Sequence, residues 1–335
     1  MKKIKAAVIG IGHLGRLHVQ NYQLIPDAEI VGIYDIDTER AHKVANEFQV
    51  RAFENLEPLL QQIEAASIVV STTSHFEITQ ACIEQGVHCL VEKPITSTLS
   101  EAERLIQLVK EKDLILQVGH IERFNPAIVA LNGFELNPMF IESHRLASFN
   151  PRGTDVAVVL DLMIHDIDII LHLVKSPVTK IDASGVAVVT DEVDIANARL
   201  GFANGCVANI TASRISQKKM RKMRLFQRNA YIGIDFLQKF SEVYQLVDSD
   251  NIKIRSNQIP IEFGQLDQYG KSKKITYERH QIEEANALKM ELESFLNSIR
   301  TGKHPAVSGE EGQEALRVAI EITDMIKSQV KALIG

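Results

Sequence analysis

Near its beginning the chain reads Ile4-Lys5-Ala6-Ala7-Val8-Ile9-Gly10-Ile11-Gly12-His13-Leu14-Gly15. The apolar run predicts a buried strand and the segment after it predicts a helix, so the pattern Gly-x-Gly-x-x-Gly falls at a strand-to-helix turn. In that setting the glycines allow a tight turn, the approach of a pyrophosphate, and close packing of the helix on the strand. The phosphates would lie at the N-terminus of the helix. We therefore expect Gly10, Gly12, His13, Leu14 and Gly15 to contact a dinucleotide.

A carboxylate follows the second predicted strand. Asp35 comes directly after the run Glu29–Tyr34 and stands 20 residues after Gly15, where a carboxylate can accept hydrogen bonds from the adenosine ribose. The same carboxylate would repel the 2′-phosphate of NADP, and Arg40 is the nearest arginine that follows. The sequence therefore predicts NAD, with NADP less favoured, and Asp37 is interpreted as a helix cap.

Two domains follow from the pattern of predicted elements. The first 120 residues alternate short apolar runs with helical patterns, as a parallel sheet with crossover helices requires. After Gly119 come one apolar helical pattern around Leu160–Val174 and then several strand-like runs, two of them joined by a tight turn at Asn204-Gly205. We expect an α/β fold with a Rossmann domain at residues 1–121. An α+β domain with a mostly antiparallel sheet, which would bind substrate, is expected at residues 122–335.

Cap residues predict where several helices begin and end. Ser100 with Glu103, and Ser308 with Glu311, have the spacing of a capping box. Gly86 fits a helix C-terminal stop. The expected strands of the first domain are Ile4–Ile9, Glu29–Tyr34, Ser67–Ser71, His88–Val91 and Leu114–Val118, and the two closing helices are expected near Ala285–Ile299 and Gly309–Ile334.

The composition excludes several classes of protein. With 335 residues, 45% of them hydrophobic, the chain is long enough for two separate cores. Its formal net charge of -6 gives no general attraction for nucleic acid or an anionic membrane. Three cysteines without Cys-x-x-Cys spacing indicate neither a disulfide framework nor a thiolate metal site. No apolar run is long enough to span a membrane. From this and from the cysteine pattern we expect a cytoplasmic protein, and we expect no metal site.

Two further segments fall at the carboxyl edge of the predicted parallel sheet, where ligands bind in such folds. Ser71-Thr72-Thr73-Ser74-His75 lies at the end of the third of these apolar runs, and its hydroxyls either line the cofactor or serve as loop and helix-cap groups. Glu92-Lys93-Pro94 follows the next run. The proline can hold the peptide cis and aim Lys93 inward, although a lone lysine is also a common surface group. From these segments we expect Thr72, Thr73, His75, Glu92 and Lys93 to contact the cofactor.

The helical pattern around residue 165 carries polar groups on an otherwise apolar helix. Asp161, His165, Asp168 and His172 form one stripe at helical spacing, and the other faces are largely apolar, which is typical of a buried helix. Buried carboxylates and imidazoles need partners or a function. The alternative is an ordinary wet face of an amphipathic helix, and a metal site is less favoured because no further ligand cluster accompanies the stripe.

Over essentially its full length the sequence resembles the glucose-fructose oxidoreductase / inositol dehydrogenase / rhizopine-catabolism (Gfo/Idh/MocA) family. The resemblance rests on Gly10-x-Gly12-x-x-Gly15-x-x-His18, Ser71–His75, Gly86–Pro94 and Asp161-x-x-x-His165-x-x-Asp168. It implies an NAD(P)-dependent oxidoreductase with a Rossmann domain and an open-sheet domain that often forms dimers or tetramers. It places Lys93, Asp161 and His165 in catalytic roles. Thr73-Ser74 and His120 depart from the family pattern.

The resemblance implies oxidation of a secondary alcohol. His165 would take the hydroxyl proton while hydride leaves carbon for the nicotinamide, Lys93 would stabilise the developing negative charge, and Asp161 would orient His165 or bind substrate. Residues 119–126 and 161–168 resemble the branch that acts on nucleotide-activated amino sugars such as UDP-N-acetylglucosamine. Such a dianion needs local cations. The candidates are Arg123, Arg152, Arg214 and the basic cluster Lys218–Arg224, which is equally well read as a solvated loop leading into a strand.

Two other functions are compatible with the sequence. A dehydrogenase of a free sugar or cyclitol would make the extra basic residues incidental. A catalytically silent NAD-binding regulator would keep the fold without the chemistry, and the presence of Lys93, Asp161 and His165 argues against it.

Overall fold

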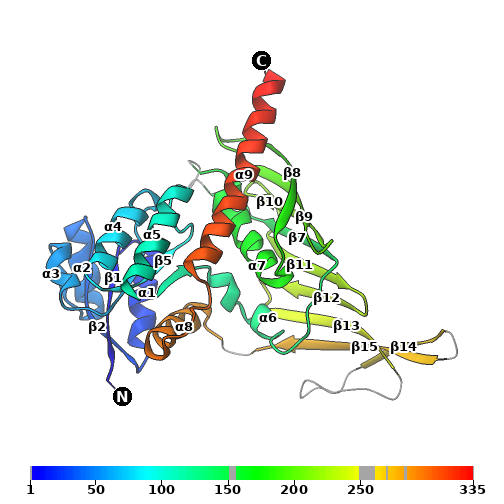
Figure 1. Ribbon diagram of the computed structural model, residues 1–335, viewed down its shortest axis with the longest axis horizontal. Coiled ribbons are helices and arrows are strands. Elements are labelled where there is room, and N and C mark those ends of the chain that lie inside the picture. The colour runs from blue at the N-terminus through cyan, green and yellow to red at the C-terminus, as the bar shows by residue number, and fades with distance from the viewer. Residues whose placement is uncertain (1, 151–155, 249–260, 269–270, 283–284, 335) are drawn as a thin grey trace. The chain divides into compact units, whose positions relative to one another are not determined.

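The computed structural model describes residues 2–150, 156–248, 261–268, 271–282 and 285–334 (Figure 1). The chain divides into two compact units: unit 1 comprises Met1–Ile121 and Asn286–Arg317, and unit 2 comprises Glu122–Ala285 and Val318–Gly335. The division after Ile121 agrees with the expected domain boundary. Residues 286–317 differ from the expectation, because they belong to unit 1 and not to the second domain.

The physical reason lies in the apolar face of helix α8 (Ala287–Thr301). Leu288, Leu292, Phe295 and Leu296 join the same buried core as Val19 and other residues of unit 1, and α8 contacts helix α1 (His13–Gln23). Hydrophobic periodicity predicts that such a helix has a buried face but does not say which core receives it.

Unit 1 is a six-stranded parallel sheet in the order β3-β2-β1-β4-β5-β6, which is the strand order of dinucleotide-binding domains. The order reverses between β1 and β4, so a ligand crevice is expected outside the carboxyl ends of those strands. The strands are β1 (Ile4–Ile9), β2 (Ala28–Tyr34), β3 (Ala52–Phe53), β4 (Ala65–Ile68), β5 (His88–Glu92) and β6 (Leu116–Gly119). The helices between them are α1, α2 (Thr38–Phe48), α3 (Leu56–Leu60), α4 (Thr72–Glu84) and α5 (Leu99–Lys112).

The caps of unit 1 agree with the sequence except at one helix. Asp37 caps α2 by accepting a hydrogen bond from the Arg40 backbone N–H at 3.0 Å, and Ser308 with Glu311 forms the expected capping box before α9 (Gly309–Ile334). The box expected at Ser100 lies two residues earlier, at Thr98 with Glu101. Both pairs have the Ser/Thr-x-x-Glu spacing, so spacing alone could not choose between them.

Unit 2 is built on a nine-stranded sheet in the order β14-β15-β13-β12-β11-β7-β10-β9-β8. One pair, β7 with β10, is parallel and the others are antiparallel, which confirms the expected mostly antiparallel sheet. The strands are β7 (Phe140–Leu146), β8 (Val178–Val186), β9 (Ile195–Phe202), β10 (Val207–Ser213), β11 (Met220–Gln227), β12 (Ala230–Asp235), β13 (Phe240–Asp248), β14 (Ile261–Gln268) and β15 (Lys271–Gln281).

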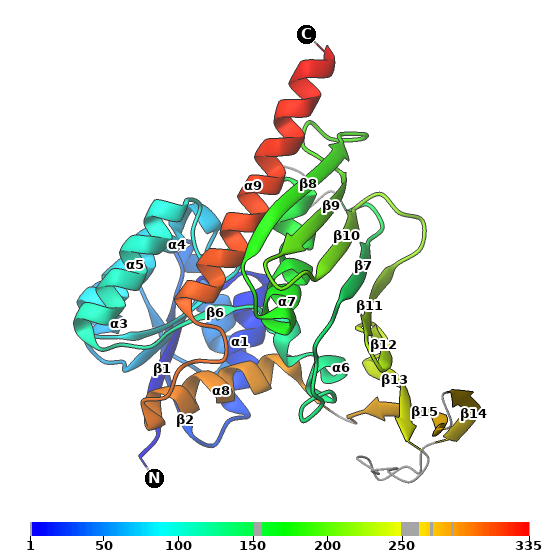
Figure 2. The same ribbon diagram turned by 45° about the vertical axis from the view of Figure 1, so that its right-hand side comes forward.

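Helices cover one face of this sheet. The π-helical turn η2 (Val159–Met163) leads into α7 (Ile164–Val174), which packs on β7 and β10, while the short helix α6 (Pro126–Val129) packs on β12, β13 and β15 (Figure 2). Strand β7 was not predicted, because its covered face carries Ser143 and Arg145. Polar residues at buried positions hide the alternation that marks a strand.

The opposite face of the sheet carries a row of aromatic rings. Each ring stands beside the next on a neighbouring strand, with centroids 4.9 to 5.7 Å apart, the spacing at which aromatic pairs attract. The row runs through Phe140, Phe226, Tyr231, Tyr244 and Tyr277. The sheet therefore presents large apolar groups on the side that α6 and α7 do not cover.

Candidate active site

The glycine turn of unit 1 is closed toward the protein and open on one side. Gly10 has a φ of +91°, and a Cβ there would lie 2.6 Å from the Val69 carbonyl oxygen. A Cβ on Gly15 would lie 1.9 Å from the Gly10 carbonyl oxygen, so a side chain there would push α1 off β1. At Gly12, no described atom outside the neighbouring backbone lies within 4 Å of where a Cβ would stand. The turn thus leaves space at Gly12, where a pyrophosphate would approach the backbone.

Asp35 holds this turn from the end of β2. Its Oδ2 accepts a hydrogen bond from the Ile11 backbone N–H at 2.6 Å, and its Oδ1 accepts one from the Asp37 backbone N–H at 2.9 Å. The Arg40 guanidinium lies 3.5 Å from Asp35 and 2.9 Å from Asp37. The structure therefore brings Arg40, the fifth residue after Asp35, to the position expected for the adenosine ribose.

A cavity of about 750 Å³ lies over the carboxyl ends of the central strands of unit 1. Most of the predicted cofactor residues line it, whereas Gly15 and Thr73 do not. Gly15 is instead covered by the packing of α1 on β1. The predicted residues at its wall are Gly10, Gly12, His13, Leu14, Asp35, Thr72, His75, Glu92 and Lys93, joined by Tyr34, Ile36, Arg40, Val69, Val70, Ser71, Ser74, Glu77 and Ile78.

His75 is buried and bridges the two loops that end β4 and β5. Its Nδ1 lies 2.8 Å from the Pro94 carbonyl oxygen and its Nε2 lies 3.2 Å from the Val70 carbonyl oxygen. Burial lowers the pKa of His75, which favours the neutral ring with a single N–H. We assign that N–H to the shorter contact, so His75 braces the segment that holds Lys93 and its cis peptide bond to Pro94.

A second histidine contacts Glu92, the residue before Lys93. His18, on α1, is fully buried, and its Nε2 lies 3.1 Å from Oε1 of Glu92. A Cβ on Gly119 would lie 2.9 Å from the Glu92 carboxyl, so this glycine leaves room for the carboxylate. Sequence reasoning gave His18 no role, although it follows the glycine motif at fixed spacing in the family pattern.

The predicted catalytic residues of unit 2 lie at the start of one helix. Asp161 is in the π-helical turn η2 and His165 is in the first turn of α7, and both side chains are half-buried. Most of the remaining α7 side chains are buried. Irregular π turns are frequent at functional sites, and this turn contains Asp161, which the sequence analysis proposes as a catalytic residue.

Arg123, predicted to bind substrate, makes a buried ion pair instead. Its Nε and Nη2 each donate to Asp168 at 2.7 Å, and its Nη1 lies 2.6 Å from Nδ1 of His172. The guanidinium is 5% exposed. This bidentate pair ties the 3₁₀ turn η1 (Ile121–Phe124) to α7, which gives Arg123 and Asp168 a structural role.

Arg145, on β7, forms a second buried network under α7. Its Nε donates to Asp166 at 2.6 Å and its Nη1 donates to Glu122 at 2.8 Å. Ser143 also donates to Asp166, at 2.9 Å. Because Asp166 follows His165 directly, this network fixes the first turn of α7 on the sheet.

Arg214 and Arg152 are the other two arginines that were expected to bind substrate. Arg214 is buried, donates to the Val156 carbonyl oxygen and lies 3.9 Å from Asp194. It therefore holds the segment that leads into η2. Arg152 lies outside the described residues.

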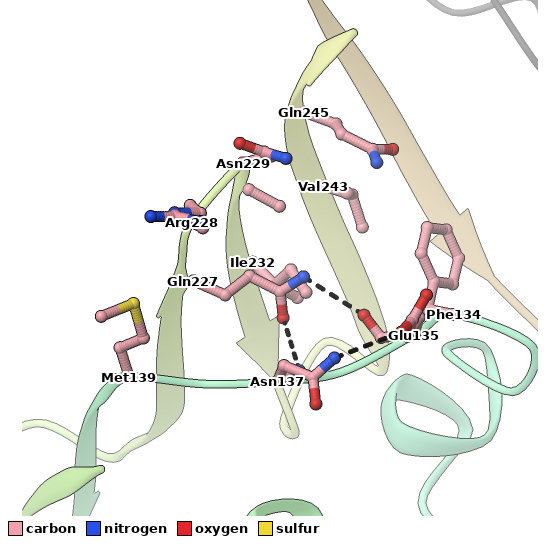
Figure 3. A pocket seen from close by; sticks show the side chains of 11 residues that line it. Phe134, Glu135, Asn137, Met139, Gln227, Arg228, Asn229, Ile232, Val243 and Gln245 are labelled. Carbon is pink, nitrogen blue, oxygen red and sulfur yellow. Dashed lines mark hydrogen bonds between the residues drawn. The ribbon is translucent and has the colours of Figure 1, made fainter. Parts of the chain in front are cut away.

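Unit 2 contains a separate cavity of about 530 Å³ beside the turn between β11 and β12 (Figure 3). Its wall carries several side-chain amides. Gln227 is held in place there, because its Oε1 accepts from the Asn137 backbone N–H at 3.0 Å and its Nε2 donates to the Glu135 carbonyl oxygen at 3.2 Å. None of the predicted catalytic residues lines this cavity, so the cavity in unit 1 remains the candidate cofactor site.

Comparisons with known proteins agree with this architecture. Residues 4–120 match the oxidoreductase family with an NAD-binding Rossmann fold, and residues 140–232 match the GFO/IDH/MocA C-terminal domain. The chain is 37% identical over 324 residues to UDP-N-acetylglucosamine 3-dehydrogenase from Acidithiobacillus ferrooxidans, covering 96% of this chain and 97% of that one. A solved structure with that name and organism superposes with a TM-score of 0.86 at 36% identity, covering 98% and 99% of the two chains.

A more distant relative has a different name. Myo-inositol 2-dehydrogenase from Thermotoga maritima is 26% identical over 331 residues, which is 93% of each chain.

Within the described residues, no helix is long and apolar enough to cross a membrane. The family matches to both halves of the chain, and the 37% identity over nearly its full length, establish that the chain belongs to the Gfo/Idh/MocA family of oxidoreductases.

Proposed function

We propose that this enzyme oxidises a secondary hydroxyl of a nucleotide-activated amino sugar, with NAD as the acceptor and UDP-N-acetylglucosamine as the substrate. The observation that carries the proposal is the 37% identity over 96% of the chain to an enzyme named for that substrate. Three buried free cysteines fit a reducing compartment, and we place the enzyme in the cytoplasm.

The residues of unit 1 fit a dinucleotide. The open space at Gly12 lies at the N-terminus of α1, where backbone N–H groups favour a pyrophosphate. Asp35 lines the same cavity, and its carboxylate supports NAD over NADP, although Arg40 lies 3.5 Å from it. When bound, the nicotinamide supplies the site that accepts hydride.

The protein's own residues would manage the proton and the charge. His165 accepts the proton of the reacting hydroxyl, Lys93 donates a hydrogen bond to the same oxygen, and Asp161 orients the substrate or the imidazole. His75 and the pair His18–Glu92 support the Lys93 segment through the contacts described above. Arg123 and Arg214 hold the protein fold through their own ion pairs and are not proposed as phosphate ligands.

The glycine turn yields a prediction that separates cofactor binding from folding. Gly12→Val should leave the melting temperature near that of the wild type, because the space around the added Cβ is open, and should weaken NAD binding at least about tenfold by blocking the pyrophosphate. Gly15→Val should instead lower the melting temperature, because its Cβ would meet the Gly10 oxygen. Calorimetric NAD titration and thermal unfolding of both variants check this, and unchanged NAD affinity in Gly12→Val would contradict it.

The aromatic row on the uncovered face of the sheet supports a homodimer or homotetramer formed through unit 2. Aromatic rings are enriched in the buried centres of protein interfaces. We expect light scattering to give a mass at least twice that of the chain, and Tyr231→Asp, which places a charge within the row, to reduce that mass. A wild-type protein that stays monomeric at micromolar concentration would refute this assembly.

A substrate panel tests the proposed function. The wild-type protein with NAD is offered UDP-N-acetylglucosamine, free N-acetylglucosamine, glucose and myo-inositol while the absorbance of NADH is followed. Reduction of NAD by the nucleotide sugar alone is expected. Reduction by myo-inositol or glucose with equal efficiency would instead support a dehydrogenase of a free sugar or cyclitol, which the 26% identity to a myo-inositol dehydrogenase makes the second candidate.

A further inference from the structure

The basic cluster Lys218–Arg224 is divided between the two faces of the sheet by β11. In the strand register Arg221 stands opposite Arg145 of β7, whereas Lys222 stands opposite His144. Successive side chains of a strand point to opposite faces. Arg221 therefore shares the covered face with Arg145 and α7, while Lys222 and Arg224 belong to the uncovered face.

The cations of the uncovered face each have a carboxylate of their own. Lys222 lies 3.1 Å from Asp235, the residue paired with it on β12. Arg224 lies 2.6 Å from Glu142, the residue paired with it on β7. These cross-strand pairs account for the two side chains as part of the sheet surface.

Among the described residues, Arg221 shares its carboxylate with Arg145. Its Nη1 lies 3.5 Å from Oε1 of Glu122, and that same oxygen already accepts from Arg145 at 2.8 Å. Within the described part of the chain, this long contact is the only side-chain hydrogen bond or ion pair of the Arg221 guanidinium. The side chain is 42% exposed, whereas Arg145 is 2% exposed. Of the two arginines that contact Glu122, Arg221 is thus the more exposed one and has the longer hydrogen bond.

Arg221 is a partly buried cation that shares its carboxylate with Arg145. Partial burial and the neighbouring Arg145 cation lower the pKa of Arg221, and the carboxylates of Glu122 and Asp166 offset this only in part. Arginine nevertheless keeps its charge in proteins. A ligand carrying negative charge would therefore be stabilised beside it, and the planar guanidinium has donors in the geometry that phosphate oxygens accept.

Ion pairs also connect Arg221 to α7, the helix that carries the candidate catalytic residue His165. Asp166 bonds to Arg145 at 2.6 Å and directly follows His165 on α7. Arg221 therefore belongs to the same covered face of unit 2, and the same ion network, as the turn that carries His165. Ion pairs through Glu122 and Arg145 thus join Arg221 to the residue that follows His165.

We propose that Arg221 binds a phosphate of the substrate's nucleotide part and so makes the enzyme specific for nucleotide sugars over free sugars. This inference rests on the proposed function, which names a substrate of that class. Of the seven residues in the cluster, it assigns the phosphate contact to one and leaves Lys222 and Arg224 to the sheet surface.

The test compares Arg221→Met with Lys222→Met, a matched loss of positive charge one residue along the same strand on the opposite face. We expect Arg221→Met to raise the KM for UDP-N-acetylglucosamine about 10–100-fold, because one charge-assisted contact is lost, with the KM for NAD unchanged. Lys222→Met should leave both values near the wild type. Arg221→Lys, which keeps the charge without the planar fork, should fall between them.

A binding measurement gives the test a second readout. UDP and uridine are titrated into each protein as ligands that differ in the diphosphate. Arg221→Met should lose affinity for UDP and keep its affinity for uridine, and Lys222→Met should lose neither. Equal UDP affinity and equal KM in the two variants would overturn the proposal.

The two failures are distinguishable. A wild-type enzyme that does not oxidise UDP-N-acetylglucosamine and does not bind UDP refutes the proposed function and this inference together. An enzyme that oxidises the nucleotide sugar with undiminished KM after Arg221→Met refutes the inference alone. If Arg221→Met unfolds, Arg221→Lys decides, because wild-type KM and UDP affinity in that folded variant would contradict a bidentate phosphate contact.

Discussion

Replacing His165 with asparagine is expected to reduce turnover by about 10²–10⁴-fold, the usual contribution of a general base, while NAD binding is retained. Asparagine keeps a polar group of similar size but cannot accept the hydroxyl proton at neutral pH. His165 is half-buried at the start of α7, and most of the helix that carries it is buried. Steady-state assays with the nucleotide sugar and calorimetric titration with NAD measure the two quantities.

Lys93 provides the companion variant. Lys93→Met should lower kcat by a comparable factor, because the developing charge on the substrate oxygen would lose its donor. Two controls are matched to these changes. His144→Asn alters a histidine on the uncovered face of the sheet in unit 2, and Lys110→Met removes an exposed lysine of unit 1 that pairs with Glu310. Wild-type turnover in His165→Asn would refute the assignment of the base.

The largest expected effect on stability is that of Arg145→Met. Removing one partner of a buried ion pair leaves the other charge uncompensated, which costs about 3–5 kcal/mol. Here Asp166 would lose its arginine and Glu122 would keep the longer 3.5 Å contact with Arg221, and the side chains of Arg145, Asp166 and Glu122 are at most 8% exposed. Chemical denaturation followed by circular dichroism gives the free energy of unfolding.

Arg224→Met is the matched control for this change. Arg224 also pairs with a carboxylate across β7 and β11, at 2.6 Å, but its side chain is 47% exposed. Surface pairs contribute about 0–1 kcal/mol, so its loss should cost far less. Equal losses in the two variants would mean that the buried network does not hold α7 to the sheet.

The cofactor end of the molecule was predictable because short-range spacing determines it. The strand, glycine turn and helix of residues 4–23 are consecutive in the chain, and Asp35 follows the next strand directly. The backbone geometry of each turn depends on its own residues, such as the positive φ at Gly10 and Gly205. Even there, contacts between distant residues, His18 with Glu92 and His75 with Pro94, could not be derived from spacing.

The fate of the arginines in the second half was not predictable in the same way. Arg123, Arg145, Arg214 and Arg221 are the same residue type, and composition does not distinguish them. Strand register and helix packing decide that Arg123 meets Asp168, that Arg145 meets Asp166, and that Arg221 stands at the outer edge of the network. A change of one residue in the register of β11 would have placed Lys222 on the covered face instead.

The sequence by itself determined the parallel and antiparallel halves and the glycine turn, because these follow from local periodicity and motif spacing. Its resemblance to a known family indicated the candidate residues Lys93, Asp161 and His165. Tertiary structure alone decided that α8 completes the core of unit 1 and that β7 carries a buried arginine. It also decided which basic residues stay available to an anion. Those outcomes depend on contacts between side chains that are far apart in the sequence, and local sequence patterns do not predict such contacts.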